Sequence, residues 1–376
     1  MPLLRDVAIG SYFATVDDPR VERTRDHALL DIIIIAVCAV ICGADGWVAV
    51  EEFGITKRDW LATFLTLPNG IPSHDTFGRV FARINPEQFQ RSFLSWVESL
   101  KQVRGDLIAI DGKTHRGARD RSSGKAALHL VSAWAAENRI VLGQVAVDTK
   151  SNEITAIPAL LDLLDLHGST VTIDAMGCQT TIADQIVRQG GNYVLALKAN
   201  QPSMLADVQA LFTDACAAQQ PEYGMTSVTA TDSGHGRTEQ RTAYVISDPE
   251  VIAYLNEGKR WRDLTSVAMI ESQRTVNDTT TVEQRYYLLN QCVTAATVND
   301  LVRGHWGIEN RLHWVLDVIF HEDASRIRTG DAPQNMGVVR HIALNLLRQE
   351  SSTISLRMKR FRAALSDTYL EKVLGL

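Results

Sequence analysis

The sequence lacks the features that mark secreted, fibrous and disordered proteins. Its five cysteines are too few and too scattered for a disulfide framework, and none has the spacing of a metal site. No long stretch is rich in proline, glycine or serine, and no segment is repeated. The first residues, MPLLRDVAIG, lack the basic and apolar segments of a signal peptide. We therefore expect a protein of the reducing cytoplasm.

Long hydrophobic runs are also scarce. The longest, ALLDIIIIAVCAVICG from Ala28 to Gly43, is shorter than the roughly 20 residues that span a bilayer, and Asp31 interrupts it. Cys38 and Cys42 lie within this run, where small buried thiols are common. We predict a fully buried helix here and no membrane partner.

Length and composition favour a globular protein with about two or three domains. The 376 residues are 45% hydrophobic and 22% charged, which allows sizeable cores. The net charge of -6 argues mildly against a nucleic-acid partner, because phosphate attracts cations. Cations nevertheless gather in two stretches, 113–125 and 340–376. These stretches are compatible with DNA binding, although most charge runs are simply solvated.

Residues 1–103 are predicted to be helical. Ser73 has the character of a helix N-cap, and Pro86 opens a further helix. Arg79 and Arg83 would be exposed on the first of these two helices, which could dock in a DNA groove. A helical domain with a packing role alone explains the same pattern.

From Asp106 onward, strands and helices alternate. Three β-type runs (LIAID, LHLVSAWAA and IVLGQVAVD) precede a helix at 152–166, the strand STVTIDA, a helix at 180–189 and the strand NYVLALK. This is the order of a ribonuclease-H-like α/β core, with antiparallel strands at one edge and parallel strands elsewhere. We predict a β-rich insertion at about 200–293 and a helical C-terminus after Thr294.

Two aspartates stand at the ends of β-type runs. Asp111, in IAIDGKTHRG, precedes a glycine, and Asp174, in TIDAMGCQ, precedes a helix. Each alone is typical of a turn former or a helix cap. The predicted order makes their strands neighbours, and side chains at the carboxyl ends of neighbouring strands converge. We therefore expect the two aspartates to form part of one site.

A third acidic residue lies in HWGIENRLHWVLDVIFHEDASRIR. In a helix, Glu309 would share a face with His305, His313 and Leu316, because these residues are spaced by three or four positions. This face borders an apolar stripe, which consists of Leu301, Ile308, Leu312, Val315 and Ile319. A glutamate beside such a stripe ordinarily reaches out to water, but the surrounding imidazoles and Trp306 favour a functional role.

Three carboxylates without a cysteine or histidine cluster favour two-metal chemistry on phosphodiesters. Mg²⁺ prefers oxygen ligands, and two ions about 3.5–4 Å apart can activate a water molecule and neutralise a leaving oxygen. We predict that Asp111, Asp174 and Glu309 are catalytic and metal-binding, with carboxyl groups roughly 4–8 Å apart. The expected cofactor is Mg²⁺, for which Mn²⁺ would substitute.

Several motifs resemble those of the ISAs-type insertion-sequence transposases, which include the H-repeat-associated proteins. The matching stretches are IAIDGKTHRG, TIDAMGCQ, NYVLALKANQP, GHGRTEQR and RGHWGIENRLHWVLDVIFHEDASRIR, with RHIALNLLRQ behind them. The resemblance covers about 100–350, and the preceding part is similar to the family's associated helical domain. It implies a catalytic Asp-Asp-Glu triad at Asp111, Asp174 and Glu309, with a β insertion before the glutamate.

The chain departs from the pattern of a larger group of relatives at the glutamate helix. There a Tyr, an Arg and a Lys accompany the glutamate, and the corresponding positions are Val302, His305 and Leu316. The residues that would hold DNA are therefore open, and the candidates are Lys113, Arg116, Lys198, Arg303, His305, Arg311 and His313. Lys198 fits the role of a plain surface lysine equally well. We expect the basic segment 113–125 to be mobile without DNA, because its cations repel one another.

The resemblance implies a DNA transposase with a helical domain at 1–103 and a catalytic domain at 104–376. Metal-activated water would cut DNA at the ends of the element, and the freed 3′-hydroxyl would attack target DNA. The expected partners are both of these DNAs, bound by a homodimer. Two alternatives remain: a nuclease that cuts without joining, and a catalytically silent DNA-binding remnant.

Overall fold

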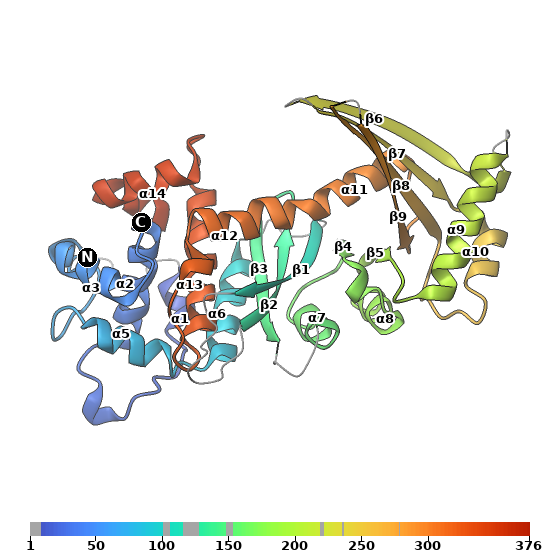
Figure 1. Ribbon diagram of the computed structural model, residues 1–376. Helices are drawn as coiled ribbons and strands as arrows, with labels where there is room; N and C mark the ends of the chain where they lie inside the picture. The colour runs from blue at the N-terminus through green and yellow to red at the C-terminus, as the bar shows by residue number, and fades with distance from the viewer. Residues whose placement is uncertain are drawn as a thin grey trace.

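A large mixed sheet runs through the molecule, with an all-helical body at one end (Figure 1). The computed structural model describes residues 9–100, 106–115, 128–147, 153–218, 222–234, 237–277 and 279–376. Its strands are β1 (Leu107–His115), β2 (Leu128–Ala135), β3 (Ile140–Val147), β4 (Thr170–Ile173), β5 (Asn192–Leu197), β6 (Thr226–Gly234), β7 (Arg237–Ile246), β8 (Ser266–Val276) and β9 (Thr279–Leu289). They form one nine-stranded sheet in the order β3-β2-β1-β4-β5-β9-β8-β7-β6. The mixed α/β class predicted from the sequence is confirmed.

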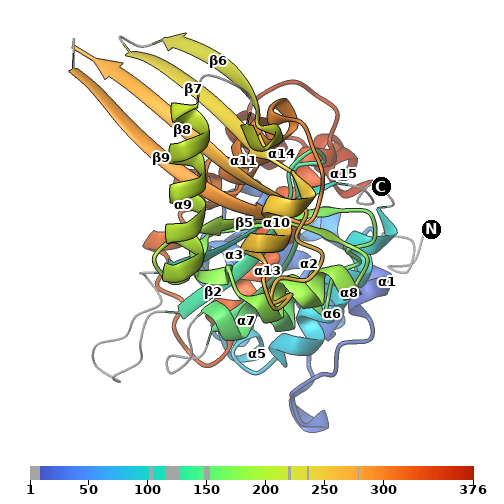
Figure 2. The same ribbon diagram turned by 90° about the vertical axis from the view of Figure 1, so that its right-hand side faces the viewer.

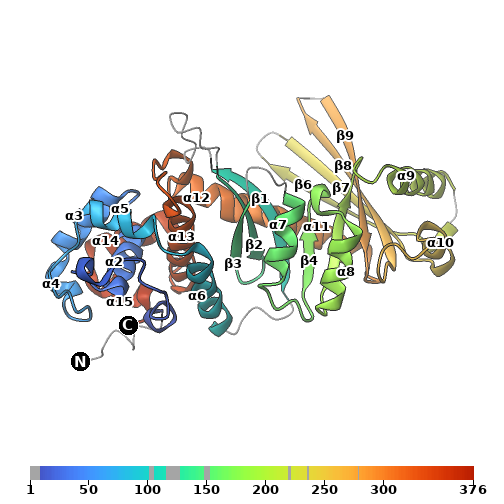
Figure 3. The same ribbon diagram turned by 90° about the horizontal axis from the view of Figure 1, so that it is seen from below.

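Among the first five strands, β1 and β4 lie side by side. β1 pairs antiparallel with β2 and parallel with β4, which in turn pairs parallel with β5. β4 has the sequence TVTI, and such β-branched residues suit a strand that is covered on both faces. Helices α7 (Glu153–Leu161) and α8 (Thr180–Arg188) cover one face, and α11 (Ala295–Gly307) crosses the other (Figures 1 and 3).

The inserted segment continues this sheet. β9 pairs antiparallel with β5, with Val194 opposite Leu289, and β8, β7 and β6 follow outward. Two helices interrupt the predicted strands: α9 (Pro202–Ala217), which contacts β9 (Figure 2), and α10 (Pro249–Leu255). The expectation of a β-rich insertion at about 200–293 did not include either helix. The signal was present for α9, since Val208, Phe212 and Ala215 have helical spacing and form its buried side.

The helical body combines the two ends of the described chain. Its helices are α1 (Gly10–Phe13), α2 (Leu29–Cys42), α3 (Trp47–Thr56), α4 (Arg58–Leu61), α5 (His74–Phe81), α6 (Pro86–Ser99), α13 (Ala332–Gln349), α14 (Leu356–Leu365) and α15 (Asp367–Leu374). The apolar run forms α2, whose residues from Ile32 to Ile41 are all buried, as expected. No single helix among the described residues has the length and apolar character to cross a membrane, and one bent pair, Glu22–Cys42 with Trp47–Thr56, meets those criteria together.

Buried hydrogen bonds join the C-terminal helices to the N-terminal ones. Asn335 on α13 donates from Nδ2 to the carbonyls of Phe81 and Ile84, at 2.8 and 3.0 Å. Arg360 on α14 donates to the carbonyl of Val40, at 2.9 Å, near the end of α2. The carbonyls of Phe81 and Val40 belong to the last turns of α5 and α2, and Ile84 lies between α5 and α6. The predicted catalytic segment 104–376 therefore contributes its last helices to the core of the first segment.

We expect Asn335→Ala to lower the free energy of unfolding by about 1–3 kcal/mol, because it leaves two buried carbonyls without donors. Chemical denaturation measures this change. A matched control is Asn310→Ala, since Asn310 is exposed and its side-chain hydrogen bond within the described part of the chain is a local one, to the carbonyl of Trp306. We expect the control to stay within about 0.5 kcal/mol of the wild type. Equal losses in both variants would show that Asn335 does not tie the two ends together.

Candidate active site

The register of the sheet brings two aspartates together. Ile110 of β1 is paired with Ile173 of β4, and the strands are parallel. Asp111 and Asp174 each follow directly after this pair, so both lie at the same end of the β1–β4 pairing. Asp111 differs from its prediction in one respect, because β1 does not end there but continues to His115 against β2. The pairing with β4 stops instead, and this leaves one side of β1 open beside Asp111.

The carboxylate of Asp174 is held by a backbone amide at the start of the next helix and by a lysine. Its carboxylate caps the short helix Ala175–Gly177 by accepting from the backbone amide of Ala175, at 2.6 Å, and Lys198 lies 3.2 Å from the same oxygen. Burial alone would raise the pKa of this carboxyl, but the amide of Ala175 and the ammonium of Lys198 outweigh it and lower the pKa below its ordinary value. The carboxyl of Asp174 is therefore ionised at neutral pH.

Glu309 lies in an irregular part of its helix. α11 ends at Gly307, a π-helical turn spans Ile308–His313, and α12 (Trp314–Val318) follows. A π-turn inserts an extra residue into the helical repeat, and such turns are frequent at functional sites. Leu316, which was predicted to share the face of Glu309, is instead buried in the hydrophobic core. The change of repeat explains this error, because the predicted face assumed a regular helix.

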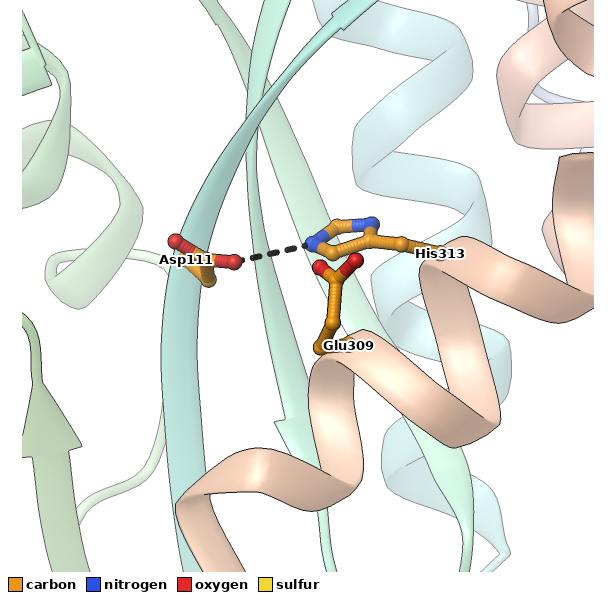
Figure 4. A group of neighbouring side chains, drawn as sticks. All are labelled: Asp111, Glu309 and His313. Atoms are coloured by element: carbon orange, nitrogen blue, oxygen red, sulfur yellow. Dashed lines mark ion pairs between the residues drawn. The ribbon is translucent and has the colours of Figure 1, made fainter. Parts of the chain in front are cut away.

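Glu309 and His313 meet Asp111 across the gap between helix and strand (Figure 4). One ligand atom of each of these three residues lies within 4.8 Å of the other two. The Nε2 atom of His313 is 3.4 Å from an oxygen of Asp111, and the side chain of His313 is 5% exposed. Asp174 is not part of this close group. It lines the same cavity of about 470 Å³ as Asp111 and Glu309.

The donor atoms of this group fit a divalent metal ion. Two carboxylates supply oxygen ligands, and an imidazole with no hydrogen-bond partner among the described residues supplies a nitrogen. Three acids around one cavity would repel one another, and a cation would relieve that repulsion. Asp111, Asp174, Glu309 and His313 are the residues that could hold such ions.

His305 lies between the two aspartates. Its Nδ1 is 3.1 Å from the hydroxyl of Thr172 on β4, and the ring lines the cavity. Burial lowers the pKa of His305 below its ordinary value, although the carboxylates of Asp111 and Asp174 oppose that shift. The ring is therefore neutral at pH 7 and acts through hydrogen bonds.

Lys113, a candidate DNA contact from the sequence, lies in a buried network of charges in this structure. Its ammonium forms ion pairs with Asp317 of α12 and with Glu322, 2.9 Å away, and its side chain is only 12% exposed. Glu322 is itself buried and lies 3.6 Å from Arg340. Lys113 is thus bonded inside the protein and unavailable to DNA phosphate in this state. This buried network joins β1 to the chain that follows Glu309, and sequence reasoning missed it because its members are far apart in the chain.

The other candidate cations lie in different surroundings. Arg303 is exposed on α11, 3.9 Å from Asp232 of β6, and Arg311 is exposed beside it on the π-turn. Both line a second cavity, of about 880 Å³, between α11 and the inserted strands. His313 points toward Asp111 and is buried, so it does not face outward as a DNA ligand would. Arg116, and with it the segment 116–125 that was expected to be mobile, lies outside the described residues.

One residue of the cavity, Arg285, was overlooked in the sequence. Arg285 of β9 lies over the ring of Trp306, 4.9 Å from its centroid, and both line the cavity with the three acids. The alternating pattern of β9 gave no sign of this, because the inserted strands were treated as a separate unit. Their pairing with β5 brings β9 to the site.

A glycine allows the helix to approach the sheet closely. A Cβ atom on Gly304 of α11 would lie 2.1 Å from a terminal methyl of Leu107 on β1, closer than atoms can approach. One turn later, a Cβ on Gly307 would meet its nearest neighbour, Trp134, at an ordinary 3.7 Å. Gly304 therefore leaves room for the end of the Leu107 side chain beneath α11.

Comparison with known proteins gives a consistent result over almost the whole chain. The family described as DDE_Tnp_1-associated matches residues 11–97, and the family described as transposase DDE domain matches residues 104–346. The chain is 39% identical over 368 residues to "Putative transposase YncI" of Escherichia coli O157:H7, which covers 97% of this chain and 93% of that one. It is 38% identical over 371 residues to "H repeat-associated putative transposase YhhI" of Escherichia coli strain K12, with 97% of each chain covered. Among solved structures, a piggyBac transposase synaptic complex with hairpin DNA aligns with a TM-score of 0.40 and 10% identity, over 98% of this chain and 78% of that one.

The close approach of α11 to β1 is tested by a double-mutant cycle on stability. We expect Gly304→Ala to lower the free energy of unfolding by about 1–3 kcal/mol through overpacking against Leu107. Leu107→Ala removes the methyl group that clashes, so the double variant should recover part of that loss, with a coupling of about 0.5–3 kcal/mol.

The same cycle with Gly307→Ala is the matched control, and it should show no coupling to Leu107. Additive losses for Gly304 and Leu107 would mean that this contact does not set the position of the helix.

Proposed function

This chain belongs to the DDE transposase family of the H-repeat type, and from this premise we propose that Asp111, Asp174 and Glu309 are its catalytic acids. The protein is a DNA transposase. The observation that carries the proposal is that these three carboxylates, from two adjacent strands and one crossing helix, line a single cavity.

We also propose that the catalytic part, 104–376, is built on a ribonuclease-H-like core, preceded by a helical domain at 1–103. Three features support this core: an antiparallel edge of β1 to β3, parallel β4 and β5, and helices on both faces. The inserted strands extend such a core at β5.

The proposed reaction uses two Mg²⁺ ions. When bound, they would activate a water molecule for attack on a phosphodiester and neutralise the leaving 3′-oxygen. Asp111 would serve both ions, and support for this is that Asp174 follows the neighbouring strand and Glu309 faces Asp111 from the helix. Manganese would substitute, because carboxylates suit Mn²⁺ as well as Mg²⁺.

The residues around the acids have supporting roles in this proposal. Lys198, which is exposed, pairs with Asp174 in the absence of DNA and is in reach of a phosphate that enters the cavity. Arg285 and His305 line the same cavity. A neutral His305 would donate a hydrogen bond to a phosphate oxygen. These contacts hold the scissile phosphate near the acids, which favours reaction by proximity.

The substrates we propose are the DNA ends of the element and a target DNA. After cleavage, the freed 3′-hydroxyl attacks a target phosphodiester, so that one P–O bond forms as another breaks. Both ends must be held during this step, and a homodimer provides two such sites.

The central test is cleavage and strand transfer with DNA that carries the element's own ends, in Mg²⁺. Asp111→Ala, Asp174→Ala and Glu309→Ala should each abolish both reactions and leave DNA affinity largely intact, because affinity comes mainly from cationic contacts. A gel assay for cleavage and joining, with a filter-binding assay for affinity, measures both properties.

Glu283→Gln is the matched control, since Glu283 lines the same cavity but pairs with Arg285. This variant should keep cleavage within about tenfold of the wild type, which corresponds to about 1.4 kcal/mol. Retained cleavage in Glu309→Ala would overturn the triad. Cleavage without joining by the wild type would indicate a nuclease.

Two substitutions of His305 separate DNA contact from packing. If the ring contacts DNA, His305→Arg restores a donor and keeps partial activity, whereas His305→Ala loses most of it. If the ring only fills space next to Thr172, Arg is the worse replacement, because it is larger and harder to bury. Cleavage rates of both variants, with thermal melts to check folding, decide between these accounts. Wild-type rates in both would exclude a role for His305.

A further inference from the structure

His313 is a buried imidazole without hydrogen bonds. The residue is 4% exposed, and neither ring nitrogen has a hydrogen-bond partner among the described residues. Buried polar atoms are nearly always paired, because they lose their bonds to water without compensation. An imidazole in this state is free to bind a group that the described residues do not supply.

The direction of the ring shows where such a group would bind. Nε2 faces Asp111, and the carboxylate of Glu309 lies beside the ring (Figure 4). The distance of 3.4 Å from Nε2 to Asp111 is longer than a good hydrogen bond, so the two groups do not satisfy one another. All three ligand atoms lie within 4.8 Å of one another, a spacing that a single ion between them would fit.

We infer that His313 is a metal ligand of the transposase, and that its Nε2 completes the binding of the ion held by Asp111 and Glu309. This inference rests on the proposed function, which supplies the two carboxylates, and adds a nitrogen to a set of oxygen ligands. The role assigned from the sequence, contact with DNA, is replaced by this one.

A nitrogen ligand changes which ion is preferred. Imidazole suits transition metals, whereas Mg²⁺ favours oxygen and keeps its waters. The ion at Asp111 and Glu309 should therefore favour Mn²⁺ over Mg²⁺ in affinity. An ion that is held by carboxylates alone would lack the preference for Mn²⁺ that a nitrogen ligand gives.

Pulsed EPR of bound Mn²⁺ tests the inference without measuring activity. In the full-length wild type, the Mn²⁺ signal should show coupling to ¹⁴N, and labelling all histidines with ¹⁵N should convert it to ¹⁵N coupling. His313→Gln should remove the coupling, whereas His305→Gln, a change in the same cavity, should keep it. His167→Gln is an exposed control that should also keep it.

Calorimetric titration supplies a second readout. His313→Gln should weaken Mn²⁺ binding by about tenfold or more, since loss of even an outer-sphere partner costs about 10–100-fold. Mg²⁺ affinity should fall by less, because the glutamine carbonyl offers oxygen.

The outcomes separate this inference from the proposed function. Mn²⁺ binding that depends on Asp111 and Glu309 but shows no ¹⁴N coupling in the wild type overturns the role of His313 and leaves the triad standing. Coupling that is lost in His305→Gln and kept in His313→Gln would identify His305 as the ligand, and this also overturns the role of His313. Mn²⁺ binding that is unaffected by Asp111→Asn and Glu309→Gln refutes the proposed metal site itself. The labelled wild type gives its answer even if His313→Gln does not fold.

Discussion

The close packing of one helix against one strand is the constraint on which the site depends. Glu309 is separated from Asp111 by 198 positions in the chain, and the contacts of α11 and of the π-turn with β1 bring their carboxylates together. Gly304 favours that contact, because a Cβ atom at this position would force the end of the Leu107 side chain to move. Such a contact has to offset the repulsion between carboxylates, and burial of apolar residues on both sides of it contributes to this.

A second contact fixes the same helix farther along. Lys113 is two residues after Asp111 on β1, and it pairs with Asp317 and Glu322, which follow Glu309. Removing one partner from such a buried group leaves a charge unpaired and is strongly unfavourable, so the network resists displacement of the helix. Gly304 lies before Glu309 and the Lys113 network after it, and the glutamate is held between the two points. The π-turn then aims Glu309 and His313 at the same strand.

The sequence predicted the parts of this arrangement that depend on local pattern. The strand order, the buried helix α2 and the mixed sheet followed from alternation and apolar spacing. The sequence did not predict the contacts between residues that are far apart in the chain. The basic character of Lys113 suggested DNA, and only the fold shows that two acids from beyond Glu309 meet it. Leu316 was placed beside Glu309 by counting regular turns, which a π-turn invalidates. The three acids were selected by residue type and resemblance, and the fold adds the cavity that they share.

Anomalous diffraction from crystals of the full-length protein with Mn²⁺ and element-end DNA tests the central claim most directly. The account predicts anomalous peaks in the cavity of about 470 Å³, with the carboxylates of Asp111, Asp174 and Glu309 as their protein oxygen ligands. Peaks that form without Asp174 or Glu309, or that lie elsewhere in the molecule, would contradict it.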